Sequence, residues 1–322
     1  MSEPVYRLRG KRVWVAGHTG MVGAALARRL DEAGAVILTA PRARADLRRQ
    51  DQVEATVAAL KPDAVFIAAA TVGGILANDS RPAEFIYDNL TIVSNVVDAC
   101  AGGVEKLMVL GSSWIYPKHA AQPMIEDAML DGALEPTNQW YAVAKIAGIK
   151  LAQAYRRQHG KDFIAVVPTN LYGPGDNFDL AASHVVPALL RKCHEAKRRG
   201  GPVEIWGTGL PRREFLYVDD AADALVFLME NYAADDIINV GGGTDVSIRE
   251  LADAAAAATG YKGGFAYAAD KPDGTPLKRL DATRLLAMGW RPRTILADGL
   301  ARTYDWFKQA LAMPAGRRAR VA

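Results

Sequence analysis

Three observations predict an α/β fold, in which a doubly wound parallel sheet is joined to a smaller C-terminal domain. Short apolar strands alternate with amphipathic helices over the first half of the 322-residue chain. A glycine-rich turn at Gly17, Gly20 and Gly23 follows the first strand and opens a helix. After Pro168 the alternation gives way to segments rich in Pro, Gly and Asn. Alternating strands and helices form a parallel sheet covered on both faces, and a chain of this length can bury such a core.

The elements of the first half follow from hydrophobic periodicity. The apolar run RVWVA at 12–16 predicts the first strand, which ends at the glycine turn. Residues 21–33 have helical periodicity and stop at Gly34, because glycine favours helix ends. The same patterns predict further strands at 36–39, 64–69, 107–110 and 164–167, and further helices at 52–60, 83–101 and 139–159.

The sequence of the second half of the chain predicts shorter strands and helices, some of which belong to a second domain. Strands are expected at 203–206, 215–218 and 237–240, the last returning to the main sheet, and helices at 183–198, 221–231 and 247–259. Ser247 and Glu250 form a capping-box pattern at the start of the last helix, and Gly260 follows it as a stop. We expect one domain from residues 1–172 and 215–243, and a second from residues 173–214 and 244–322.

Composition and charge exclude several classes of protein. Because 39 basic residues face 36 acidic ones, the net charge of +3 disfavours a dedicated nucleic-acid binder. The most apolar stretch, 64–77, is too short for a membrane span and contains two glycines. Residues 1–10 lack the apolar core of a secretory signal. Cys100 and Cys193 have neither metal-ligand nor disulfide-framework spacing, so we expect a cytoplasmic protein without a metal.

The glycine turn predicts a dinucleotide site. Its glycines allow a pyrophosphate to approach the backbone, and the following helix N-terminus offers free N–H donors. An acidic residue after the second strand would bind the ribose 2′-OH of NAD, whereas this chain has Arg42 and Arg44 there. Arginine suits a 2′-phosphate, so we expect NADPH rather than NADH, with Asp46 and Leu47 near the adenine. The basic run 42–49 could otherwise be a solvated face, as could the run 192–199.

Ser112, Tyr141 and Lys145 form a candidate catalytic set. Tyr141 and Lys145 are four residues apart in an expected helix, so they lie on one face, and a nearby ammonium lowers the pKa of a phenol. Such a tyrosine can exchange a proton with a carbonyl oxygen. Ser112 follows a parallel strand and can hydrogen-bond the same oxygen as alkoxide charge develops. Each residue alone is a weak signal, but together behind the glycine turn they predict hydride transfer to or from a carbonyl.

At this point the chain resembles the GDP-L-fucose synthases, which are extended short-chain dehydrogenases/reductases with a Rossmann fold. The resemblance spans residues 11–307. The matching runs are AGHTGMVG at 16–23, AAATVGGI at 68–75, LGSS at 110–113, IYPK at 115–118, EPTN at 135–138, YAVAKIAGI at 141–149, PTNLYGP at 168–174 and KPDGTP at 271–276. The resemblance implies an enzyme that uses NADPH on a GDP-4-keto-6-deoxy sugar, epimerising C3 and C5 and then reducing C4. It also implies a homodimer formed by a four-helix bundle, with 83–101 and 139–159 as candidate helices, although their apolar stripes could instead face the sheet.

The family pattern also suggests site residues. It implies that His184 is the acid of the epimerisation. Substrate contacts are expected from Lys192, Trp206, Arg213 and Asp273; Lys192 and Arg213 can pair with a diphosphate, and Trp206 can stack on a ring or simply fill the core. Cofactor contacts are expected from Gly17, Thr19, Gly20, Met21, Val22, Gly23, Arg42, Arg44, Asp46, Leu47, Leu110, Gly111, Lys145, Pro168, Asn170, Leu171 and His184.

One residue departs from the family pattern. The run SSCIYP of the family is here SSWIYP, with Trp114 in place of the cysteine that removes protons beside the keto group. An indole has no titratable group near neutral pH and is much bulkier than a thiol. We therefore hypothesise a reductase that has lost the epimerase activity and acts on a GDP-4-keto-6-deoxy hexose or heptose. Such sugars feed capsular polysaccharide or lipopolysaccharide.

Three alternatives remain open from the sequence. The chain could be a full GDP-L-fucose synthase with a different base. It could be a nucleotide-sugar 4-epimerase that retains NAD, although the arginines after the second strand disfavour this. It could also be a non-catalytic NADPH-binding scaffold, which the intact Ser112, Tyr141 and Lys145 disfavour.

Overall fold

A six-stranded parallel sheet forms the centre of the larger lobe in the computed structural model, which describes residues 3–268, 270–271 and 273–313. The strand order is β2-β1-β3-β4-β5-β9, and all five pairings are parallel. The strands are β1 (Arg12–Ala16), β2 (Val36–Leu38), β3 (Ala64–Ile67), β4 (Lys106–Leu110), β5 (Asp162–Pro168) and β9 (Ile238–Val240). The predicted doubly wound parallel sheet is confirmed.

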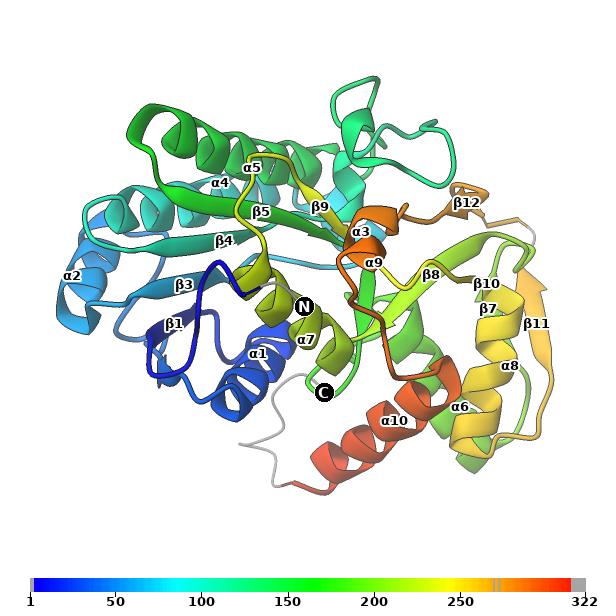
Figure 1. Ribbon diagram of the computed structural model, residues 1–322. Helices are drawn as coiled ribbons and strands as arrows, with labels where there is room; N and C mark the ends of the chain where they lie inside the picture. The colour runs from blue at the N-terminus through cyan, green and yellow to red at the C-terminus, as the bar shows by residue number, and fades with distance from the viewer. Residues whose placement is uncertain (1–2, 269, 272, 314–322) are drawn as a thin grey trace.

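Helices cover both faces of this sheet, as Figure 1 shows. One apolar core lies between the sheet and helices α1 (Met21–Glu32) and α7 (Val218–Asn231). A second core lies on the opposite face, under α2 (Gln50–Leu60), α4 (Pro82–Cys100) and α5 (Gln139–His159). Coverage on both faces explains why β1, β3 and β4 read as continuous apolar runs rather than as alternating ones.

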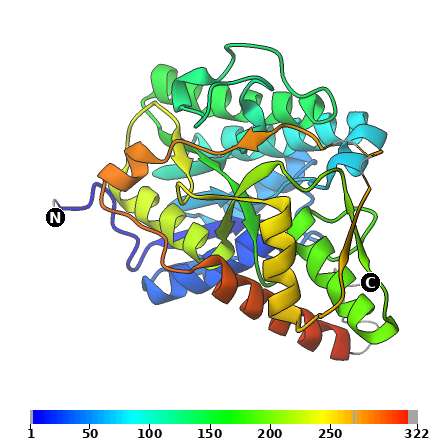
Figure 2. The ribbon, with the colours of Figure 1, turned by 90° about the vertical axis from the view of Figure 1, so that its right-hand side faces the viewer.

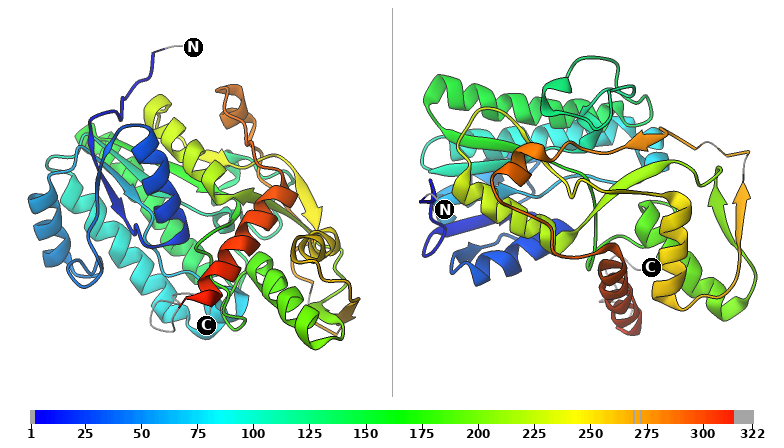
Figure 3. Two further views of the ribbon diagram at one scale, coloured as in Figure 1. Left: turned by 90° about the horizontal axis from the view of Figure 1, so that it is seen from below. Right: turned by 45° about the vertical axis from the view of Figure 1, so that its right-hand side comes forward.

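A smaller lobe carries its own sheet and its own core. Its central strand is β8 (Arg212–Tyr217), which pairs with β6 (Asn170–Tyr172), β10 (Asp245–Ser247) and β12 (Leu277–Lys278). A separate parallel pair joins β7 (Val203–Trp206) to β11 (Phe265–Ala268). Figures 2 and 3 show α6 (Val185–Arg199), α8 (Ile248–Thr259) and α10 (Leu296–Ala312) grouped in this lobe, where they bury a third apolar cluster.

Short elements complete the chain. They are α3 (Ile75–Ser80), α9 (Thr283–Ala287) and two 3-10 turns, η1 (Ser113–Ile115) and η2 (Glu126–Ala128). No helix in the described part of the chain combines the length and the apolar character needed to cross a membrane.

Most expected elements are found within three residues of their expected ends. The return of 237–240 to the main sheet is confirmed, and the Ser247 capping box is present with Gly260 in a left-handed conformation. β8 and α7 each begin three residues earlier than expected, at Arg212 and Val218. The second sheet takes strands from both expected domains, because β6 and the second half of β8 belong to the first, and β10, β12 and the first half of β8 to the second. The division into domains stays a prediction.

Candidate active site

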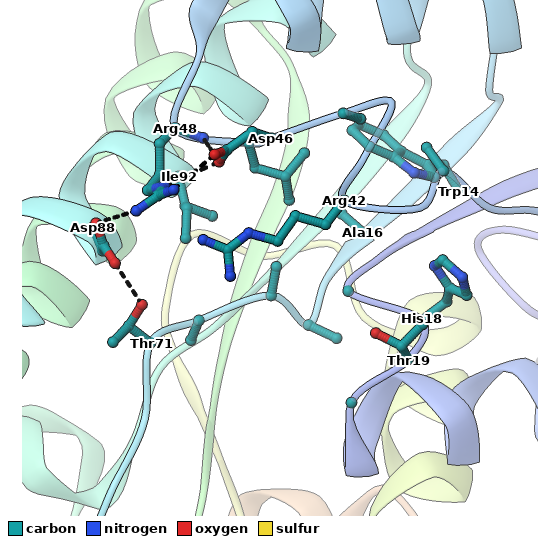
Figure 4. Close-up of a pocket in the computed structure, with 18 residues that line it drawn as sticks. Trp14, Ala16, His18, Thr19, Arg42, Asp46, Arg48, Thr71, Asp88 and Ile92 are labelled. Carbon is teal, nitrogen blue, oxygen red and sulfur yellow. Dashed lines mark hydrogen bonds and ion pairs between the residues drawn. The ribbon is translucent and has the colours of Figure 1, made fainter. Parts of the chain in front are cut away.

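The first part of the site lies where the strand order reverses. β1 has β2 on one side and β3 on the other, and ligands of open α/β sheets bind at the carboxyl ends of such strands. A pocket opens there, shown in Figure 4. Residues from five places line it: β1 itself, the turn after β1, the loop after β2, the segment after β3, and α4. Of the expected cofactor residues, the lining includes Gly17, Thr19, Gly20, Arg42, Asp46 and Leu47.

The glycine turn has the shape that a pyrophosphate requires. Gly17 has a φ of +94°, and a Cβ there would lie 2.6 Å from the backbone nitrogen of Ala69. A Cβ on Gly23 would lie 2.2 Å from the carbonyl oxygen of Gly17. Gly20 is the N-cap of α1, so the first N–H groups of the helix point toward the pocket end. Met21, Val22 and Gly23 form the first turn of that helix and do not line the pocket.

The arginines in the loop after β2 differ in their side-chain partners. Hydrogen bonds from Arg48 at 2.7 and 3.0 Å hold the pKa of Asp46 at about 2. Arg48 also contacts Asp88, which in turn accepts a hydrogen bond from Thr71. Arg42 reaches into the same pocket in Figure 4, with no hydrogen bond or ion pair to any of the residues drawn. Arg44 is exposed and lies outside the pocket lining.

Sequence reasoning selected Arg42 and Arg44 and did not single out Arg48. Only the side-chain partners distinguish the three arginines, since all of them follow the same strand. Arg48 is held by two carboxylates, whereas Arg42 has no hydrogen bond or ion pair with any residue that the structure describes. The assignment of a 2′-phosphate to Arg42 stays a prediction.

Ser112, Tyr141 and Lys145 come together at the ends of β4 and α5. Ser112 is the N-cap of η1, and its hydroxyl accepts a hydrogen bond from the Trp114 N–H at 3.4 Å. Tyr141 is hydrogen-bonded to Ser112. Lys145 donates to the carbonyl oxygen of Leu110 at 2.9 Å, and its amine lies 5.5 Å from the centre of the Tyr141 ring.

The pKa of Tyr141 differs from the sequence expectation. Burial raises it to about 12, against a smaller lowering by the hydrogen bond with Ser112, and Lys145 is not among the causes. Burial lowers the pKa of Lys145 to about 8. The environment thus keeps the phenol protonated, as a proton donor requires. The expected lowering of the phenol pKa by Lys145 is not found, and burial dominates instead.

The remaining expected cofactor residues surround the same strand ends. Leu110 ends β4 and Gly111 follows it, and Leu110 lines a small second pocket together with Lys145. Pro168 ends β5, while Asn170 and Leu171 lie in β6, where the Asn170 amide donates to the Glu214 carbonyl oxygen at 2.9 Å. His184 is the N-cap of α6, and burial lowers its pKa, which favours the neutral imidazole.

The expected substrate residues gather around β7 and β8. Lys192 donates to the Glu204 carbonyl oxygen at 3.1 Å, and the Trp206 indole N–H donates to the Glu204 carboxylate at 3.2 Å. Trp206 is 47% exposed, which disfavours a role as core filler. Asp273 accepts hydrogen bonds from the Thr208 N–H and hydroxyl at 2.6 and 2.8 Å, so it holds the loop after β7.

A buried cation beside Arg213 was missed by sequence reasoning. Lys278 pairs in register with Arg213 in the parallel strands β12 and β8, so both side chains lie on one face. Lys278 is 7% exposed, and its amine lies 3.0 Å from the centre of the Trp114 ring. The matching run at 271–276 stops two residues short of it, and no local pattern marks a two-residue strand.

No group of three or more His, Cys, Asp or Glu side chains that could hold a metal ion occurs among the residues described. Both cysteines are buried, and burial raises the pKa of the Cys100 thiol to about 12 and that of the Cys193 thiol to about 11.

Comparisons with known proteins agree with this geometry. The model of the NAD dependent epimerase/dehydratase family matches residues 13–241. A GDP-L-fucose synthase of Sinorhizobium fredii is 55% identical over 311 residues, which cover 96% of this chain and 99% of that protein. A GDP-6-OMe-4-keto-L-xylo-heptose reductase from C. jejuni has a TM-score of 0.87 at 32% identity, covering 93% of this chain and 98% of that one. A GDP-mannoheptose C4 reductase from Campylobacter jejuni, solved with NADP bound, has a TM-score of 0.84 at 33% identity, covering the same shares.

Proposed function

Because this chain belongs to the NAD dependent epimerase/dehydratase family and, within it, to the GDP-L-fucose synthases, we propose that it reduces C4 of a GDP-4-keto-6-deoxy sugar without epimerising C3 and C5. The chain is an NADPH-dependent oxidoreductase of the extended short-chain dehydrogenase type. The observation that carries the proposal is the pairing of an intact Ser112–Tyr141–Lys145 set with Trp114 beside it.

The reduction needs one hydride and one proton. Bound NADPH supplies the hydride to the carbonyl carbon. Tyr141 delivers the proton to the carbonyl oxygen, and its raised pKa keeps that proton available at neutral pH. Ser112 hydrogen-bonds the same oxygen as charge develops on it. Lys145, held by the Leu110 carbonyl oxygen, is positioned to bind the nicotinamide ribose and to compensate the phenolate that forms.

The surroundings of Trp114 support the loss of epimerisation. Exchange at C3 and C5 needs a base to remove each proton and an acid to return it. Trp114 has no basic atom, and the raised pKa values of the buried Cys100 and Cys193 thiols leave almost no thiolate to act as a base at neutral pH. The neutral imidazole of His184 is a weak acid.

The substrate side of the proposal follows from charge. Lys278 is buried and the neighbouring Arg213 is half-buried, and a diphosphate could pair with both. Trp206, half exposed, offers a face for a ring. The similarity of this fold to GDP-heptose reductases supports a heptose substrate as much as a hexose substrate. We propose that the product feeds the synthesis of bacterial capsule or lipopolysaccharide and that the enzyme is cytoplasmic. We further propose that it is a homodimer formed by α4 and α5.

A full GDP-L-fucose synthase is the second candidate. It is favoured by the 55% identity with a protein of that name, against 32% and 33% for the reductases. An NAD-dependent 4-epimerase is disfavoured by the free Arg42, and a non-catalytic scaffold by the intact catalytic set.

Incubation with a GDP-4-keto-6-deoxy sugar in deuterated water separates the two candidates. We expect NADPH oxidation, with deuterium absent from C3 and C5 of the product by NMR. Trp114→Cys should restore exchange, and Trp114→Ser is the matched control because it opens the same space without a thiol. Rapid exchange by the wild type would establish the full synthase instead, and a lack of NADPH oxidation with hexose and heptose substrates alike would refute reduction.

A further inference from the structure

Lys278 lies on a segment that the fold holds from two sides. On one side β12 pairs with β8, and the Arg212 N–H donates to the Pro276 carbonyl oxygen at 2.7 Å. Immediately after Lys278, the Arg279 carbonyl oxygen accepts from the Met124 N–H at 2.8 Å. Figure 2 shows this orange segment crossing between the turquoise loop that follows β4 and the strand β8. The Lys278 backbone is therefore fixed between the two lobes.

A buried carboxylate strengthens this placement. Glu214, which is fully buried, accepts hydrogen bonds from the Leu280 N–H at 2.9 Å and from the Gly243 N–H at 2.8 Å. Glu214 follows Arg213 in β8, so the strand that carries Arg213 also holds the segment that carries Lys278. The backbone leaves little freedom for Lys278 except in its side chain.

The Lys278 amine has an aromatic partner and no acidic one. It makes no hydrogen bond or ion pair with a side chain or carbonyl in the part of the chain that the structure describes, and it lies over the Trp114 indole. The neighbouring carboxylates are engaged elsewhere: Glu135 pairs with Lys118 at 3.1 Å, and Asp273 accepts from Thr208. Burial and the charge of Arg213 lower the pKa of Lys278 well below its usual range, against a smaller raising by Glu135.

An indole face opposes that loss of charge. An ammonium over an aromatic face is attracted by the ring quadrupole, most strongly over tryptophan and when the pair is shielded from water. A cysteine at position 114 offers no such face. Trp114, which stands in place of the cysteine base of the epimerisation, therefore stabilises the charged Lys278 amine.

We propose that Trp114 is a positioning residue, whose indole keeps the Lys278 amine charged and fixed beside Arg213 for an anionic substrate group. The proposal rests on the proposed function in taking that group to be the diphosphate of a GDP-sugar. Trp114 acts through Lys278 and takes no part in proton transfer.

GDP binding to the NADP⁺-saturated enzyme tests this without any turnover. We expect Trp114→Leu to weaken GDP binding about 5- to 30-fold by calorimetry, and Trp114→Phe to weaken it less, because phenylalanine is the weaker cation–π partner. Guanosine, which has no phosphate, should bind both variants as it binds the wild type. Trp140→Leu is the matched control, since Trp140 is an exposed tryptophan on α5.

Two further readouts distinguish positioning from mere packing. In a Lys278→Met background, Trp114→Leu should have no additional effect, because the charge on which it acts is gone. The loss of GDP affinity with rising pH should begin about one pH unit lower in Trp114→Leu than in the wild type. Equal losses in both backgrounds, or an unmoved pH profile, would overturn the proposal; Lys278→Gln replaces Lys278→Met if the latter does not fold.

The outcome is separable from that of the proposed function. A wild type that reduces a GDP-keto sugar but whose GDP affinity ignores Trp114 refutes this inference alone. A wild type that binds GDP in a Trp114-dependent way but oxidises no NADPH refutes the proposed reduction alone. If the wild type exchanges deuterium at C3 or C5, against the proposed function, loss of that exchange in Lys278→Met at unchanged GDP affinity would make Lys278 a base and overturn the positioning role.

Discussion

Substitution of Arg42 is expected to convert a preference for NADPH into near indifference between NADPH and NADH. Arg42 lines the cofactor pocket with free donors, whereas Arg48 is committed to Asp46 and Asp88. A hydrogen bond to a charged group contributes about 1.5–3 kcal/mol. Loss of that contact to a 2′-phosphate corresponds to a fall in kcat/KM of about 10- to 150-fold. Because Arg42 is exposed, we expect a value near the lower end of this range for Arg42→Ala.

The assay is the oxidation of NADPH and of NADH, followed by absorbance at several cofactor concentrations. Arg42→Ala should lower kcat/KM with NADPH and leave the value with NADH within about twofold, since NADH has no 2′-phosphate. Arg44→Ala serves as the control, because Arg44 is exposed and outside the pocket lining. An equal loss with both cofactors, or a larger loss in Arg44→Ala than in Arg42→Ala, would refute this assignment.

Three further predictions concern proton supply, the glycine turn and the inter-lobe contact. Lys145, with a pKa of about 8, is charged below that pH and neutral above it, so kcat/KM for reduction should fall as the pH rises through about 8. The residual activity of Lys145→Arg should not show this fall. A fall that persists in Lys145→Arg would belong to another group. Gly17→Ala should abolish cofactor binding by fluorescence titration, because its Cβ would collide with the Ala69 backbone; binding within threefold of the wild type would contradict this. Glu214→Ala should lower the free energy of unfolding by about 2–6 kcal/mol in urea, because two buried N–H groups lose their acceptor, and a change below about 1 kcal/mol would show that water replaces the carboxylate.

Local patterns predicted the parts of the site that local interactions build. The helix that carries Tyr141 and Lys145 has the predicted ends, since Gly160 in a left-handed conformation stops it as a glycine there should. The glycine turn likewise lies between a strand and a helix. α10 was not predicted, although its apolar face packs in the core of the smaller lobe, as periodicity over 296–312 could have shown.

Long-range pairing explains what the sequence could not indicate. β6, β10 and β12 have two or three residues each, too few for any periodicity, and they form only because β8 lies between them. Lys278 acquires its meaning from that pairing, which brings it beside Arg213, and from the loop that brings Trp114 over it. The pair of Arg48 with Asp46 is local, but its second pair, with Asp88, is tertiary and no local pattern indicates it.

Burial acts in opposite directions on the two proton donors that the family pattern names, and this difference bears on which reactions the site can perform. Removing a phenol from water disfavours its anion, so Tyr141 keeps its proton and can deliver it to a carbonyl oxygen. Removing an imidazole from water disfavours its cation, so His184 favours the neutral form, whose remaining N–H is too weak an acid to return a proton to a sugar carbon. One physical cause thus favours reduction and disfavours epimerisation. If deuterium exchange returns in Trp114→Cys, the thiol alone was limiting. If it stays absent while the thiol is accessible to alkylation, the uncharged His184 is the second barrier, and exchange should then appear below neutral pH.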